Sequence, residues 1–217
     1  ELEEVISVEK NKFNKNNIDF VCVQLEKNMG LGIALQRGLE KCKYDYVARM
    51  DADDIAADTR FENQLKYMNE HKDIESKVIR TKTMPLTYKD LYKYGKYRNP
   101  LNHMTVFFRK KDVLDVGGYK PLKGLEDYYL WCRMLSNGYK IANIDKVLVH
   151  ARLGNFENRR GGFEYFKTYI KLRILQKRLK YTNLAEFVVA TILTALITLS
   201  PKNLRGGLYK VLRKSGR

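Results

Sequence analysis

Hydrophobic and polar positions in the first quarter of the chain follow the spacings of two kinds of secondary structure. Residues 20–25 form a short β-favouring run between polar residues, which is typical of a strand. Apolar residues then recur at helical spacing over residues 31–39, and a second β-favouring run covers residues 44–48. Strand, helix and strand in this order predict a βαβ unit, and therefore an α/β fold.

The turn between the first predicted strand and its helix has the composition of a ligand-binding loop. Asn28 is a suitable N-cap for the helix. Gly30 and Gly32 allow a ligand to come close to the backbone at the helix start, where free N–H groups favour anions. An ordinary strand-to-helix turn explains the same residues equally well.

Three acids, Asp51, Asp53 and Asp54, follow the second predicted strand directly. Crowded carboxylates repel one another unless a cation or hydrogen-bond donors share their charge. Mg²⁺ binds one or two protein carboxylates together with substrate phosphates, and open α/β sheets bind ligands at the carboxyl ends of their strands. The pattern therefore indicates a metal-bridged diphosphate site, with a solvated acidic turn as the alternative.

Two other acid-loop chemistries use similar residues. A calcium loop of the EF-hand type needs an oxygen ligand at its fifth position and Gly at its sixth, but Ile55 and Ala56 stand there. An aspartyl-phosphate enzyme would use Asp51 as nucleophile and Asp53 as acid/base. Ile55 replaces the usual Thr or Val of such enzymes, so this second chemistry is weakened but stays open.

A second pair of acids, Glu126 and Asp127, begins a predicted helix that carries Leu130, Met134 and Leu135 on one side. The helix dipole favours acids in a first turn, which is a purely structural explanation. The same dipole keeps a carboxylate ionised, as a general base requires. Farther along, His150 ends a predicted strand over residues 146–149.

The basic residues outside the predicted helices also allow two interpretations, one functional and one structural. His103 precedes a predicted strand and either faces a ligand or bonds nearby backbone. Arg152, Arg159 and Arg160 match phosphate oxygens, or form a solvated basic loop. Arg49 is expected to pair with one of the acids beside it or with the ligand that they bind.

The formal net charge of +16 is concentrated in the last quarter of the chain. Residues 164–217 contain twelve Lys or Arg and two Glu, so they contribute +10. Residues 165–181 are a candidate basic amphipathic helix, and residues 184–200 are strongly apolar but short for a membrane span. We expect a catalytic domain over residues 1–163 and a basic helical tail over residues 164–217 that binds an anionic membrane surface; simple packing of these helices on the domain is the alternative.

Composition restricts the partners and the compartment. Basic, Tyr-rich chains can bind nucleic acid, but no nucleic-acid motif is present and the charge lies beside the most apolar segment, so we expect no nucleic-acid partner. The three cysteines are scattered and the first residues are acidic. We therefore expect a reducing compartment, with the protein peripheral at the inner face of the plasma membrane.

Several ordered motifs resemble the family-2 glycosyltransferases of GT-A fold, especially bacterial enzymes of capsule and surface-polysaccharide synthesis. They include LEKNMGLGIALQRGLEKCKYDYVARMDADD, NPLNHMTVFFRKKDVLDVGGY, LEDYYLWCRMLSNGYKIANIDKVLVHARL and RRGG, which span about residues 20–165. The resemblance implies a mixed, mostly parallel Rossmann-like sheet followed by amphipathic helices. It also implies transfer of a sugar, with inversion, from a nucleotide-diphosphate sugar to the hydroxyl of a saccharide or lipid-linked acceptor.

Carried over to this sequence, the resemblance assigns roles to individual residues. Asp51 and Asp53 would hold Mn²⁺ or Mg²⁺, with His150 as a further ligand, and Asp51 would also meet the donor ribose. Asp127 would be the general base, and Glu126 would hold the acceptor or position Asp127. Donor binding is expected from the remaining residues of this set: Asn28, Gly30, Arg49, Arg159 and Arg160.

The chain also departs from the family pattern. The usual opening strands are not seen, so residues 1–17 are expected to form only the helix that follows the second of them. The region after Asp73 is short, with Val78 and Ile79 as the remnant of a strand. The sequence therefore predicts an N-terminally incomplete domain, and it leaves open a non-catalytic, membrane-associated remnant or partner subunit.

Overall fold

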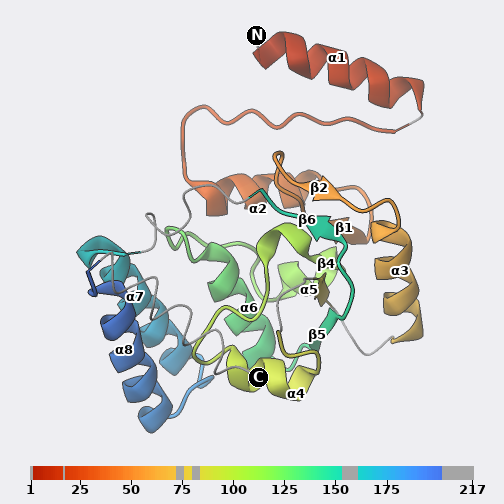
Figure 1. Ribbon diagram of the computed structural model, residues 1–217. Coiled ribbons are helices and arrows are strands. Elements are labelled where there is room, and N and C mark those ends of the chain that lie inside the picture. Colours follow the sequence, from red (N-terminus) through yellow and green to blue (C-terminus); the bar gives the residue numbers. More distant parts are fainter. Residues whose placement is uncertain (1, 17, 72–75, 80–83, 153–160, 202–217) are drawn as a thin grey trace.

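The computed structural model describes residues 2–16, 18–71, 76–79, 84–152 and 161–201. It is a mixed α/β structure with a compact body, from which the first helix stands apart (Figure 1). The helices are α1 (Leu2–Lys15), α2 (Leu31–Lys41), α3 (Arg60–Glu70), α4 (Tyr88–Tyr94), α5 (Lys110–Asp115), α6 (Glu126–Ser136), α7 (Phe163–Arg178) and α8 (Leu184–Thr198), with the short 3₁₀ helix η1 (His103–Thr105). The strands are β1 (Tyr46–Ala48), β2 (Ile55–Ala56), β3 (Ser76–Ile79), β4 (Phe107–Arg109), β5 (Ile141–Ile144) and β6 (Val149–His150).

The main sheet has the strand order β1-β4-β3-β5. β4 pairs antiparallel with both β1 and β3, and β3 pairs parallel with β5. The mixed, mostly parallel sheet is confirmed for the described residues: β1, β3 and β5 run in the same direction, and β4, which lies between β1 and β3, runs against both. A separate antiparallel ribbon joins β2 to β6 beside the acidic loop.

The strand predicted over residues 20–25 does not form. This segment pairs with none of the described strands, and Val21 and Val23 are exposed. A β-favouring run becomes a strand only where a neighbouring strand and a buried face receive it. The expected βαβ unit is therefore reduced to α2 and β1, while the predicted remnant at Val78 and Ile79 is confirmed as part of β3.

The hydrophobic core surrounds α6, which packs against α2, α5 and α7. Most of α6 is buried, including Tyr128, Leu130, Trp131, Met134 and Leu135. Trp131 is a core residue with no exposed surface, so it is not a sugar platform. Because other helices pack against α6 on several sides, the backbone of the two acids in its first turn is held in a fixed position.

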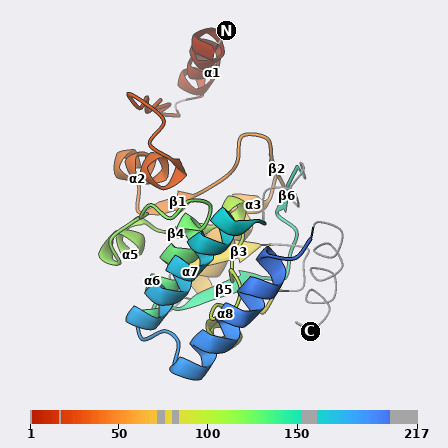
Figure 2. The same ribbon diagram turned by 90° about the vertical axis from the view of Figure 1, so that its left-hand side faces the viewer.

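The C-terminal helices form an antiparallel pair on the body (Figure 2). α7 differs from the predicted amphipathic helix, which would bury apolar residues alone. Its buried face carries Arg173 and Gln176 as well as Leu172. α8 buries Ala190, Thr194 and Thr198 and begins at a capping box between Asn183 and Glu186. Glu186 also accepts a 2.7 Å bond from Lys96 of the body. The division at residue 163 remains a prediction, but the packing of both helices on the body is an observation.

Candidate functional site

Arg49 fixes the start of the acidic loop. Its backbone N–H donates to Val106 O at 3.0 Å, and its carbonyl accepts from Arg60 Nη2 at 2.7 Å. Its side chain, which is 14% exposed, forms an ion pair with Asp51 Oδ1. The predicted pairing of Arg49 with a neighbouring acid is therefore present, and it offsets part of the charge repulsion in the loop.

The other two acids of the loop have different surroundings. Asp53 is exposed. Asp54 Oδ1 accepts from the backbone N–H of Arg152 at 3.0 Å, while its Oδ2 is buried without a hydrogen bond among the described residues. Asp54 therefore ties the loop to the segment after β6, and Asp51 and Asp53 are the acids that point to ligand chemistry.

His150 lies on β6 directly opposite Ile55 of β2, next to the acidic loop, and is exposed. Carboxylate oxygens with an imidazole are suitable donors for Mn²⁺ or Mg²⁺. In the described parts of the chain, however, no three side chains of His, Cys, Asp or Glu are gathered as a metal site. The predicted ligands thus lie in adjacent segments, and donor phosphates would have to complete the coordination.

The glycine turn before α2 differs in detail from the expected cap. Asn28 Oδ1 accepts from Gly30 N at 3.0 Å, so Asn28 closes the turn and does not cap the helix. Gly30 is the N-cap residue and has a φ of 85°, a conformation that L side chains rarely adopt. No atom lies within 4 Å of the position that a Cβ would take at Gly30, so the backbone there is open to a ligand.

α2 and α6 touch close to this turn. A Cβ at Gly32 would lie 2.9 Å from Glu126 Cγ, and Glu126 is buried. The side chain of Glu126 therefore lies against the first turn of α2. The adjacent Asp127 is half-buried, and its Oδ2 accepts from Asn99 Nδ2 at 2.7 Å.

His103 and Tyr119 form a hydrogen-bonded pair on which the charges of Arg49 and Asp127 act. Their side chains share a 2.8 Å hydrogen bond between His103 Nε2 and Tyr119 Oη, and both are buried. Burial, and then the charge of Arg49, lowers the pKa of His103 to about 3. Burial, and then the charge of Asp127, raises the pKa of Tyr119. Tyr119 is therefore within electrostatic reach of both Arg49, which precedes the acidic loop, and Asp127 at the start of α6.

The structure places the first turn of α2, after Gly30, against Glu126 at the start of α6, and it places the loop of Asp51 and Asp53 beside His150 on β6. Arg159 and Arg160 lie outside the described residues. The sequence reasoning missed Asn99 and Tyr119. Both occur in the motif NPLNHMTVFFRKKDVLDVGGY, which was singled out without a role for either residue.

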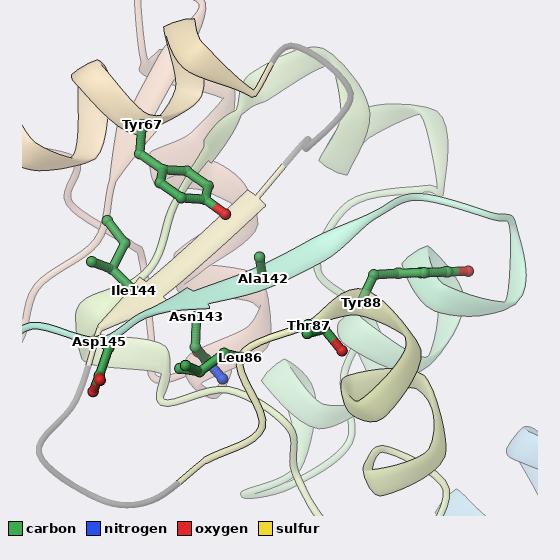
Figure 3. Close-up of a pocket in the computed structure, with 8 residues that line it drawn as sticks. All are labelled: Tyr67, Leu86, Thr87, Tyr88, Ala142, Asn143, Ile144 and Asp145. Atoms are coloured by element: carbon green, nitrogen blue, oxygen red, sulfur yellow. The ribbon is translucent and has the colours of Figure 1, made fainter.

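A separate pocket of about 450 Å³ opens elsewhere, between α3, the start of α4 and β5 (Figure 3). None of the acids discussed above is among the residues that line it, which are Tyr67, Leu86, Thr87, Tyr88, Ala142, Asn143, Ile144 and Asp145. Concavity alone therefore does not locate the chemistry in this protein.

Comparison with known proteins identifies the family. A family profile described as "Glycosyl transferase family 2" matches residues 7–119. The chain belongs to glycosyl transferase family 2. This glycosyltransferase is 37% identical over 211 residues to the amylovoran biosynthesis glycosyltransferase AmsE of Erwinia amylovora, covering 92% of the chain and 79% of AmsE.

A second relative is described in more chemical detail. The glycosyltransferase is 37% identical over 207 residues to the UDP-Gal:alpha-D-GlcNAc-diphosphoundecaprenol beta-1,3-galactosyltransferase of Escherichia coli, covering 88% of the chain and 74% of the relative. These similarities make the chain a transferase enzyme of the kind found in bacterial polysaccharide synthesis.

Solved structures support the GT-A fold. S. aureus TarS 1–349 in complex with UDP-GlcNAc has a TM-score of 0.63 at 17% identity, over 87% of this chain and 60% of that one. The mannosyltransferase PcManGT of Pyrobaculum calidifontis, in complex with GDP-Man and Mn²⁺, has a TM-score of 0.54 at 15% identity, over 97% and 68% of the two chains. The glycosyltransferase thus spans little more than half of the TarS structure, and at such identities the likeness shows the fold.

Proposed function

We propose that this glycosyltransferase moves a sugar from a nucleotide-diphosphate sugar to an acceptor hydroxyl with inversion, in the synthesis of a bacterial surface polysaccharide. The observation that carries the proposal is the geometry around two carboxylates: Asp51 is paired with Arg49 after β1, and Asp127 accepts from Asn99 at the start of α6, where Glu126 lies against the glycine turn. A group suited to bind a metal diphosphate and a group suited to take a proton are thus each held in a defined position.

The donor would lie between the turn at Gly30 and the loop at Asp51. Backbone N–H groups at the start of α2 are free to meet phosphate oxygens, because the first turn of a helix leaves its donors unpaired. Asp51 and Asp53, with His150 nearby on β6, would hold a Mn²⁺ or Mg²⁺ ion, which when bound neutralises charge on the departing diphosphate. Arg49 supplies a fixed positive charge beside them.

Asp127 would act as the general base. It takes the proton of the acceptor hydroxyl, whose oxygen attacks the anomeric carbon from the side opposite the diphosphate. The bond between that carbon and the diphosphate oxygen breaks, and the nucleoside diphosphate leaves. Glu126, buried against α2, would hold Asp127 and the donor turn in register.

The acceptor is proposed to be lipid-linked, and the enzyme to work at the inner face of the membrane. Across the described residues, every helix is too short or too polar to cross a bilayer. The proposed membrane location is supported instead by α8, because its small residues Ala190, Thr194 and Thr198 are buried against the body while its large apolar residues are exposed to solvent. The exposed residues are Leu184, Val188, Val189, Ile192, Leu196 and Leu199.

Basic charge accompanies this apolar face. Lys171, Lys177 and Arg178 are exposed on α7, and residues 202–217 contain six Lys or Arg and no acid. An apolar helix face beside basic residues favours the interface of an anionic bilayer, where each basic side chain adds about 1 kcal/mol. We propose that α8 lies in the plane of the membrane and keeps the acceptor side near its substrate.

A transfer assay tests the proposed chemistry. Purified protein is incubated with UDP- and GDP-sugars, Mn²⁺ and acceptors that start with α-D-GlcNAc-diphosphoundecaprenol, and the product linkage is read by NMR. We expect one donor to give an inverted product, EDTA to abolish transfer, and Asp127→Asn to lower turnover by at least about 100-fold, the low end of general-base contributions.

Calorimetry with UDP and Mn²⁺ separates this function from that of a non-catalytic remnant or partner subunit. Heat of binding in both wild-type protein and Asp127→Asn, with transfer in the wild type only, supports the proposal. No binding and no transfer would favour the remnant. Release of phosphate from a phosphate ester would instead support the aspartyl-phosphate alternative.

A further inference from the structure

Asn99 holds the carboxylate of Asp127 in a defined orientation. Its Nδ2 donates to Asp127 Oδ2 at 2.7 Å, while its Oδ1 accepts from the backbone N–H of Leu101 at 3.3 Å. The second bond fixes which end of the amide faces Asp127. Pro100, which is buried, follows directly and restricts the backbone of Asn99. The loop thus presents an oriented N–H donor to the acid.

The loop that carries Asn99 is held from α7. Arg173 donates through Nη1 to Lys96 O and through Nη2 to Tyr97 O, both at 2.8 Å. Gln176, one turn farther along the same helix, donates to Gly95 O at 3.2 Å. Three consecutive carbonyls of the loop are therefore bound by two side chains of a helix that lies more than 70 residues away in sequence.

Arg173 is only 2% exposed, and the acceptors found for its guanidinium among the described residues are neutral. Besides the two loop carbonyls, they are Thr194 of α8, Gln176 and the hydroxyl of Tyr128. Tyr128 follows Asp127 in α6 and itself donates to Gly95 O at 2.9 Å. The guanidinium of Arg173 thus binds both the loop of Asn99 and the helix of Asp127. These hydrogen bonds are charge-assisted and are stronger than neutral ones.

We propose that Asn99 is a positioning residue for Asp127, and that Arg173 acts through the loop to keep Asn99 in place. This inference rests on the proposed function, in which Asp127 is the base. α7 then belongs to the acceptor side of the catalytic machinery, in addition to linking α8 to the body. An N–H donor on a carboxylate favours its ionised form, so the loss of Asn99 would make Asp127 easier to protonate.

Carbon-13 NMR of the side-chain carboxyls tests the inference without any substrate. The signal of Asp127 is assigned by its absence in Asp127→Asn, and its titration midpoint is measured in the wild type, Asn99→Ala and Arg173→Met. We expect the midpoint to rise in both variants, more in Asn99→Ala. Glu126, Tyr119 and Cys132 are titratable groups near Asp127, and they are unchanged in these variants.

Matched controls separate positioning from general damage. Arg178→Met removes an exposed arginine from the same helix, and Asn63→Ala removes an asparagine side chain on α3. Neither is expected to move the Asp127 midpoint. If Asn99→Ala does not fold, Asn99→Ser replaces it, because its hydroxyl is too short to reach Asp127. An unmoved midpoint in a folded Asn99 variant overturns the inference.

Turnover distinguishes this inference from the proposed function. With an active donor–acceptor pair, Asn99→Ala is expected to lower kcat about 10-fold, leave the donor KM unchanged and move the acid limb of the pH profile upward. Full activity in Asp127→Asn would remove the general base and hence the proposed function. Loss of activity in Asp127→Asn together with a wild-type pH profile in Asn99→Ala would remove only the role of Asn99.

Discussion

At the residue scale, the contact between the donor turn and the acids of α6 depends on the lack of a side chain at Gly32. A Cβ there would come within 2.9 Å of Glu126 Cγ and 3.2 Å of Lys120 O. The backbone oxygen cannot move far, so α2 and α6 would have to separate. The donor side and the acceptor side of the site would lose their register.

Gly32→Ala is therefore expected to lower the free energy of unfolding by about 1–3 kcal/mol, the usual cost of overpacking. Gly38→Ala is the matched control, because it lies in the same helix with no atom within 4 Å of the added Cβ. There the alanine should stabilise the helix by about 0.5–1 kcal/mol. Urea unfolding of both variants measures the difference, and equal shifts would contradict the predicted contact.

His103 should make the protein sensitive to mild acid. Its pKa is lowered to about 3 in the folded protein, mainly by burial, whereas an unfolded histidine titrates near 6.5. Between these values the unfolded chain binds the extra proton, so stability is complete above about pH 6.5 and falls as the pH decreases.

The expected result is a lower urea midpoint at pH 5.5 than at pH 7.5, with a smaller difference in His103→Gln. Glutamine can still bond to Tyr119 but does not titrate. Parallel curves for the two proteins would assign the acid sensitivity to other groups.

The acids could be predicted from the sequence because their signals are local. Asp51 follows a β-favouring run, and Asp127 opens a helical pattern, so each is placed by its neighbours in the chain. Asn99 and Tyr119 could not be placed in this way. Each gains its role from a partner in another element, Asp127 and His103 respectively, and only the folded chain brings these partners together.

At the scale of elements, patterns predicted whether a segment is helical better than they predicted what it packs against. α2 and α6 occur where the apolar spacing placed them. Residues 20–25 have the composition of a strand but pair with none of the strands that the structure describes. For α8 the sequence showed a long apolar run, but it did not show that the small and polar members of the run face the body.

The outward face of α8 predicts membrane binding that can be weakened selectively. Ile192→Gln with Leu196→Gln should reduce co-sedimentation with vesicles of phosphatidylglycerol and phosphatidylcholine by at least about 10-fold, since burial of one such side chain is worth about 1.5–3 kcal/mol. Val5→Gln with Val8→Gln, which changes exposed residues of α1, is the control.

Unchanged sedimentation of the α8 variant would exclude this face as the membrane contact. A wild-type dimer in gel filtration that the α8 variant abolishes, with no vesicle binding by either protein, would show that a second copy covers the face.

At the scale of the whole molecule, the C-terminal helices complete the core. Leu172 of α7 and Tyr181, just after it, are members of the main hydrophobic cluster. Removal of residues 164–217 would also leave the carbonyls of the loop at residues 95–97 without their donors on α7. α7 and the residues just after it thus pack into the same hydrophobic cluster as the body, while the division at residue 163 stays a prediction.

A chain that ends at residue 163 is expected to show no cooperative urea transition, because it lacks this part of the core. A chain that ends at residue 201 keeps the packing of α7 and α8 and should unfold like the full protein. Circular dichroism follows both transitions. Cooperative unfolding of the shorter chain would show that the domain folds without these helices.

The α/β class and the family were accessible from the sequence, because ordered motifs survive across much of the chain. Which strand is reversed was not, since β4 pairs antiparallel on both sides and neither partner is close to it in sequence. Strand direction depends on which segments meet, and hydrophobic spacing carries no information about that.

The construction of α8 also bears on how the protein behaves in the laboratory. Leu196 is 59% exposed and Ile192 is 53% exposed, so in lipid-free buffer the apolar face of α8 is in contact with water. Adsorption to plastic and to air bubbles should therefore deplete dilute samples, and a mild detergent below the level that unfolds the protein should restore recovery. Assays in lipid-free buffer would then underestimate the amount of working enzyme before any catalytic constant is compared.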